Sequence, residues 1–149
     1  MKRLVLSLQE FCQNNESEEI PVAAMIVDPS NSQIISLQYN TVQRDLDVTG
    51  HAEINAIKSA CKNLGAKYLT DYVLYTSLEP CKMCASVIVA ARINKVIFGA
   101  YDPKAGAAGS MWDDLRDPRN DWQIKEVVGG VEAEAFENIL GDFFKKLRL

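Results

Sequence analysis

The chain has 149 residues, of which 48% are hydrophobic, and this length and composition suit one folded domain spanning residues 1–149. Its net charge of −4 and pI of about 5.0 argue against a protein that holds DNA or another nucleic acid mainly through a broad basic surface. The apolar runs fall well short of the roughly 20 residues of a membrane span, so we expect a cytoplasmic protein without membrane contact.

A helix and two strands are predicted in the first third of the chain. Four apolar residues recur at helical spacing near the N-terminus: Leu4, Leu8, Phe11 and Cys12. The apolar run Val22–Asp28 has the length of a strand and ends in a Pro-Ser-Asn turn signal. Gln33–Tyr39 resumes as a second strand, which predicts a β-hairpin. A loop that contains Asn40 then extends to Gly50.

A helical pattern begins at His51, the only histidine of the chain. Its apolar residues share one face: Ile54, Ile57, Cys61 and Leu64. Gly65 ends this helix, because glycine readily adopts the conformation that closes a helix. Three further elements are predicted after it: a strand at Tyr72–Thr76, a proline-initiated helix over residues 80–91, and a strand at Lys95–Gly99.

The last predicted strand, Ile124–Val128, follows Lys95–Gly99 after a long connection with its own short helix at Ser110–Leu115. A hairpin needs no such connection, whereas a parallel crossover needs about a dozen residues or more, so we expect these two strands to be parallel. An amphipathic helix at Val131–Leu147 ends the chain. Strands interrupted by helices throughout predict a three-layer α/β/α fold around a five-stranded mixed sheet.

Potential metal ligands stand at the beginning of two predicted helices. His51 opens one helix, and Cys81 and Cys84, in EPCKMC, open the other. Cysteines three residues apart share a helical face, and a helix N-terminus favours the thiolate form that binds metals. Two thiolates and an imidazole suit zinc, and three protein ligands leave a fourth position for water, as in catalytic zinc sites.

The cysteines have two other readings. A CxxC pair alone is compatible with redox chemistry. Cys12 or Cys61 could in principle supply a fourth ligand, but we expect both to be buried apolar side chains.

Glu53 lies on the helical face that is expected to be buried, where an unpaired carboxylate is costly. One explanation is a structural partner, such as a lysine or a helix N-terminus. The other is that Glu53 faces a zinc-activated water and shuttles its proton to a leaving group.

The arrangement HAE followed by PCxxC is the signature of zinc-dependent nucleobase deaminases. Further segments resemble the bacterial tRNA-specific adenosine deaminases over nearly the whole chain from Glu19: EIPVAAMIVD, YN, GHAEINAI, LYTSLEPCKMCASVIVAARINKVIFGAYDPKAGAAGS and GDFFKK. The stretch Phe98–Ser110 discriminates best between these enzymes and small cytidine deaminases. The resemblance implies a cytidine-deaminase-like fold.

The resemblance also implies an activity and its residues. The activity is hydrolytic deamination of adenosine to inosine at the wobble position of a tRNA anticodon. His51, Cys81 and Cys84 would hold one zinc ion per subunit, and Glu53 would be the catalytic proton shuttle. Six residues would contact the substrate: Asn40, Ala52, Ile20, Leu78, Asp102 and Lys104. Ala52 would do so through its backbone N–H.

The expected partners are a tRNA anticodon stem-loop and a second copy of the chain, because members of this family are homodimers. A deaminase of a free base or nucleotide, such as guanine, cytosine or deoxycytidylate, remains an alternative, since Asn55 is shared with deoxycytidylate deaminases. GAAGS and the FFKK tail speak against it. A catalytically idle RNA-binding subunit is a third hypothesis, which the presence of Glu53 disfavours.

Overall fold

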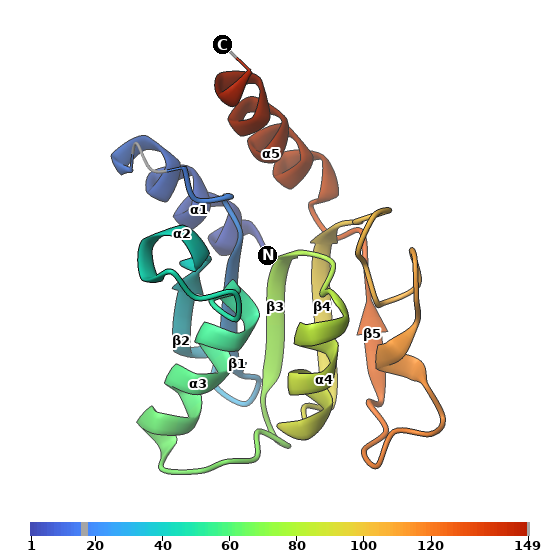
Figure 1. The fold of residues 1–149 in the computed structure, drawn as a ribbon. Coiled ribbons are helices and arrows are strands. Elements are labelled where there is room, and N and C mark those ends of the chain that lie inside the picture. Colours follow the sequence, from blue (N-terminus) through green and yellow to red (C-terminus); the bar gives the residue numbers. More distant parts are fainter. Residues whose placement is uncertain (16–17, 149) are drawn as a thin grey trace.

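A mixed five-stranded sheet runs through the molecule, and helices cover both of its faces (Figure 1). The computed structural model describes residues 1–15 and 18–148. The strands are β1 (Ala23–Asp28), β2 (Gln33–Tyr39), β3 (Val73–Leu78), β4 (Lys95–Ala100) and β5 (Glu126–Val128), in the spatial order β2-β1-β3-β4-β5. β1 is antiparallel to β2 and β3, whereas β3, β4 and β5 are parallel. The predicted hairpin and the parallel pairing of the last two strands are thus confirmed.

The helices form the two outer layers. They are α1 (Lys2–Asn14), α2 (Val42–Asp45), α3 (Ala52–Leu64), α4 (Lys82–Ala90) and α5 (Ala133–Leu147), with a 3₁₀ helix at Asp114–Arg116. α3 and α4 pack on one face around buried Ile26, Leu74 and Phe98. α1 and α5 pack on the other face around Leu4 and Phe136. The three-layer α/β/α prediction is confirmed.

α2 was not predicted, because the residues from Asn40 to Gly50 were expected to be a loop. This helix depends on a tertiary contact that local sequence does not reveal. The carboxylate of Glu19 accepts the backbone N–H groups of Gln43 and Arg44 at 3.0 and 2.9 Å. A helix N-terminus leaves its first N–H groups without intrahelical acceptors, and here a residue from a distant part of the sequence satisfies them.

The short helix predicted at Ser110–Leu115 was also placed wrongly, because only the 3₁₀ turn Asp114–Arg116 forms. Residues 111–113 are not helical, and Gly109, just before the predicted helix, has a φ of 121°. The N–H of Ser110 is bonded to the carboxylate of Glu79. This bond to a residue distant in sequence holds the backbone at Ser110 in an irregular path, and the helical turn begins only at Asp114.

The first residues of α3 and α4 lie at the same end of the sheet, where β3 and β4 end (Figure 1). Ligands of open α/β sheets bind outside the carboxyl ends of parallel strands.

Among the described residues, none of the helices combines the length and the apolar character that crossing a membrane requires.

Candidate active site

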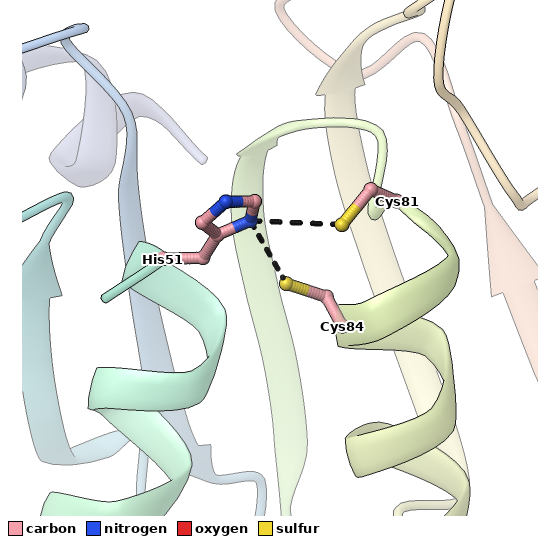
Figure 2. A group of neighbouring side chains, drawn as sticks. All are labelled: His51, Cys81 and Cys84. Carbon is pink, nitrogen blue, oxygen red and sulfur yellow. Dashed lines mark hydrogen bonds between the residues drawn. The ribbon is translucent and has the colours of Figure 1, made fainter. Parts of the chain in front are cut away.

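Three side chains with metal-binding atoms meet where α3 and α4 begin (Figure 2). His51 and Cys81 are the residues that precede α3 and α4, both in extended conformation, and Cys84 lies in the first turn of α4. Nδ1 of His51 lies 3.6 Å from Sγ of Cys81 and 3.4 Å from Sγ of Cys84. The two helix starts therefore aim the three predicted ligands at one point.

These distances fit one zinc ion. A tetrahedral zinc with bonds of about 2.0–2.1 Å to nitrogen and about 2.3 Å to sulfur separates those ligand atoms by about 3.6 Å. The ligand atoms of His51, Cys81 and Cys84 all lie within 4.8 Å of one another. The donor set also has the N/S composition that zinc prefers.

The three groups shift one another's pKa values. Hydrogen bonding from Cys84, followed by that from His51, lowers the pKa of the Cys81 thiol to about 4. The same contact with Cys81, together with burial, raises the pKa of Cys84. The hydrogen bond to Cys81 raises the pKa of His51. Because zinc binds the deprotonated ligands, metal binding displaces the protons that this cluster shares.

The other two cysteines lie outside the cluster. Cys12 and Cys61 are partly exposed, so the expectation that both are buried was wrong. Cys61 lies near the C-terminal end of α3, where its thiol is 3.7 Å from the carbonyl oxygen of Lys67. Burial of the sulfur, although partial, raises the pKa of both thiols.

Glu53 is buried, as predicted, with 4% of its surface exposed. The hydroxyl of Thr76 on β3 donates to Oε1 at 3.2 Å, and Sγ of Cys84 lies 3.6 Å from Oε2. Burial raises the pKa of the Glu53 carboxyl. A raised pKa suits a group that both accepts and returns a proton near neutral pH, although a bound zinc ion acts in the opposite direction.

A pocket of about 200 Å³ opens beside this cluster. It is lined by His51 and Cys81 of the cluster and by Glu53. It is also lined by five of the six residues predicted to contact the substrate: Ile20, Asn40, Ala52, Leu78 and Asp102. The sixth, Lys104, is exposed and does not line the pocket, although it belongs to the same loop as Asp102.

Asn40 is held by two partners that no local sequence pattern indicates, the Glu19 carboxylate and the backbone of Ile20. Its Nδ2 donates to Oε1 of Glu19 at 3.2 Å and to the carbonyl oxygen of Ile20 at 3.4 Å. The amide of Asn55 donates to the carbonyl oxygen of Tyr39 at 2.9 Å and to the hydroxyl oxygen of Thr41 at 3.0 Å. Asn55 thus contacts both neighbours of Asn40, through the backbone of Tyr39 and the side chain of Thr41, and acts here as a structural clamp.

Glu79 is the pocket residue that sequence reasoning missed most clearly. Its carboxylate accepts bonds from the N–H groups of Asp102, Ala108 and Ser110 and from the Ser110 hydroxyl. Burial alone would raise the pKa of Glu79, but these hydrogen bonds lower it below its ordinary value. A carboxylate next to the CxxC motif, at the end of a strand, was the available signal.

Comparison with known proteins agrees with this geometry. Residues 1–100 match the family described as the cytidine and deoxycytidylate deaminase zinc-binding region. The tRNA-specific adenosine deaminase of Aquifex aeolicus (strain VF5) is 43% identical over 145 residues, which cover 97% of this chain and 93% of that protein.

Two solved structures are also similar. A tRNA:A34 deaminase, from studies of A-to-I editing at the wobble position of transfer RNA, has a TM-score of 0.80 and 32% identity. That match covers 91% of this chain and 94% of the other. A guanine deaminase from Bacillus subtilis is 40% identical with a TM-score of 0.62, over 73% of this chain and 67% of that one. The chain belongs to the zinc-dependent cytidine and deoxycytidylate deaminase family and, within it, to the tRNA-specific adenosine deaminases.

Proposed function

We propose that this protein converts adenosine to inosine at the wobble position of a tRNA anticodon. The observation that carries the proposal is the match to a tRNA-specific adenosine deaminase along nearly the full length of both chains. That match includes the loop of Asp102, which lines the pocket beside the His-Cys-Cys cluster. The reaction adds water at C6 of adenine and releases the amino group as ammonia.

Each group of the site has a part in this reaction. His51, Cys81 and Cys84 would hold a zinc ion, which would supply a Lewis acid that makes water reactive near neutral pH. The Glu53 carboxylate, which accepts a hydrogen bond from the Thr76 hydroxyl, would take a proton from the attacking water and deliver it to the departing amino group. Both proton transfers fall to Glu53, because its carboxylate is buried beside Cys84 and lines the pocket.

The pocket walls suit a single extruded base. A volume of about 200 Å³ is below the roughly 300–1,000 Å³ of pockets for drug-sized ligands. Ile20 and Leu78 offer apolar surfaces to the faces of the base, and the N–H of Ala52, free of an intrahelical acceptor, can meet its edge. Asn40 stands at the same wall. Recognition of one flipped nucleotide does not require a strongly basic protein, so the acidic composition is compatible with an RNA substrate.

We also infer that the protein works as a homodimer in the cytoplasm. Leu46 and Val48, between α2 and α3, are 91% and 79% exposed, and a second copy of the chain would remove this apolar surface from water. Thiol ligands and a tRNA substrate both suit a reducing compartment. Sedimentation of the purified protein should give the mass of a dimer, and a monomer at micromolar concentration would contradict the inference.

The decisive experiment is incubation of the purified zinc-loaded protein with an anticodon stem-loop that carries a wobble adenosine. Inosine should form at that position. A stem-loop with guanosine at the wobble position and adenosine elsewhere is the matched control and should not react. Absence of inosine in the first RNA, with zinc bound, would contradict the proposed function.

Deamination of free guanine is a second candidate, favoured by the 40% identity to a guanine deaminase over 73% of this chain. The same experiment includes guanine, cytosine, deoxycytidylate and free adenosine as separate substrates. Ammonia release from guanine alone would favour this second function over the first.

A further inference from the structure

A buried carboxylate beside the metal cluster is bonded to a loop that lines the pocket. Glu79 directly follows β3 and is 2% exposed. Its Oε1 accepts the N–H groups of Ala108 and Ser110, each at 3.0 Å. Its Oε2 accepts the N–H of Asp102 at 2.9 Å and the hydroxyl of Ser110. We call the segment Asp102–Ser110 the rim loop.

The rim loop has little regular structure of its own. Its one ladder contact is an isolated bridge between Gly106 and Cys81, where the N–H of Ala107 donates to the carbonyl oxygen of Pro80 at 2.7 Å. The loop also contributes Asp102 and Ala105 to the pocket wall. Buried backbone N–H groups need acceptors, and the Glu79 carboxylate supplies them where no strand or helix does.

Gly106 shows how closely the loop approaches the carboxylate. A Cβ at this position would overlap the Glu79 carboxyl group and the backbone of Asp102. Only glycine allows the loop to close over Glu79 in this path. The course of the loop backbone at Gly106 therefore fits the position of the Glu79 carboxylate.

We propose that Glu79 is a positioning residue that fixes the rim loop as the substrate-facing wall of the pocket, without taking part in metal binding or proton transfer. This proposal rests on the proposed function, because it assigns the loop to RNA binding. Glu79 is not one of the clustered metal ligands, and its carboxylate oxygens are engaged by four donors of the loop. Its loss should therefore weaken substrate binding more than the chemical step.

The test compares the wild-type protein with Glu79→Gln, which keeps the shape of the side chain. The glutamine amide places N–H donors against loop N–H donors, because one of the two accepting oxygens is lost. KM for the wobble-adenosine stem-loop should rise about tenfold or more, while kcat changes little, since buried donors without acceptors are strongly unfavourable. Zinc content, measured by metal analysis, should equal that of the wild type.

Hydrogen exchange gives a readout that does not depend on activity. Amide exchange in residues 102–110 should accelerate in Glu79→Gln, while exchange in α3 and α4 stays as in the wild type. Ser110→Ala removes only the hydroxyl donor and should give a smaller change of the same kind. Glu137→Gln, an exposed substitution on α5, is the matched control and should change neither exchange nor KM.

Wild-type exchange in the loop of Glu79→Gln would overturn the proposal, and so would faster exchange with an unchanged KM. Loss of zinc, or a fall in kcat with constant KM, would assign Glu79 to the metal site and also overturn it. If Glu79→Gln does not fold, Ser110→Ala decides alone by its loop exchange and KM. Exchange is measured without RNA, so a failure of the proposed function is seen separately, as absence of inosine in the wild type.

Discussion

Two walls of the same pocket are held in different ways. One wall is lined by His51, Glu53 and Cys81, which together with the buried Cys84 behind them we call the metal corner; all four stand at the beginnings of two helices packed on the sheet. The other is the rim loop, whose N–H groups are bonded to the buried carboxylate of Glu79.

Under the proposed function, the metal corner carries out the chemistry and the rim loop contributes to substrate binding. The metal corner is set by the first turns of α3 and α4, so its geometry follows from the packing of those helices on the sheet. The rim loop is held largely by the side chain of Glu79, distant in sequence, and presents exposed groups such as Lys104 next to the pocket. Changes in the metal corner should therefore abolish deamination, whereas changes in the rim loop should change RNA binding.

The largest effect is expected from Cys84→Ala. This substitution removes one of three ligands, and both zinc and deamination should be lost. Metal analysis of the purified variant measures the first effect, and inosine formation measures the second. Cys61→Ala, a cysteine on α3 outside the cluster, is the matched control and should keep its zinc. Full zinc occupancy in Cys84→Ala would refute the proposed ligand set.

The second-largest effect is expected from Glu53→Gln. The amide keeps the volume of the buried side chain but cannot accept and return a proton, so kcat should fall about 10²–10⁴-fold with zinc still bound. Single-turnover assays on the stem-loop measure this loss. The exposed substitution Glu134→Gln on α5 serves as the control. Turnover like the wild type in Glu53→Gln would remove the proton-shuttle assignment.

A smaller effect is expected from Lys104→Ala in the rim loop. If this exposed ammonium meets an RNA phosphate, its removal should weaken binding several-fold and leave kcat unchanged. The dependence of log affinity on log salt should become shallower by about 0.7–0.9. Lys62→Ala, in the last turn of α3, is the control and should preserve the salt dependence. An unchanged slope in Lys104→Ala would exclude a phosphate contact at this residue.

The smallest effect concerns acid pH. The pKa of Glu79 in the folded protein lies below its ordinary value of 4.5, so the ionised carboxylate stabilises the fold above that pH. This stabilisation is lost as the pH falls through the lower, folded-state pKa. The gap in melting temperature between wild type and Glu79→Gln should therefore narrow as the pH is lowered from neutral to below about 4.5. A constant gap would indicate that the charge of Glu79 does not contribute to stability.

The sequence by itself determined the order of the main elements and the three candidate metal ligands of the metal corner. Apolar periodicity indicated five strands and four of the five α-helices, and the spacing of HAE and PCxxC put three ligands at two helix starts. Both signals are local, because they depend on residues a few positions apart. That residues 1–149 form a single domain stays a prediction.

Only the tertiary structure decided how the two pocket loops are held. Glu19 caps α2 and holds Asn40, and Glu79 holds the rim loop. Each carboxylate is separated from some of its donors by twenty or more residues, so no local pattern predicts the bonds. The physical reason is that irregular backbone leaves some N–H groups outside any regular pattern of carbonyl acceptors, and the carboxylate that satisfies them is brought close only when the sheet and helices have packed.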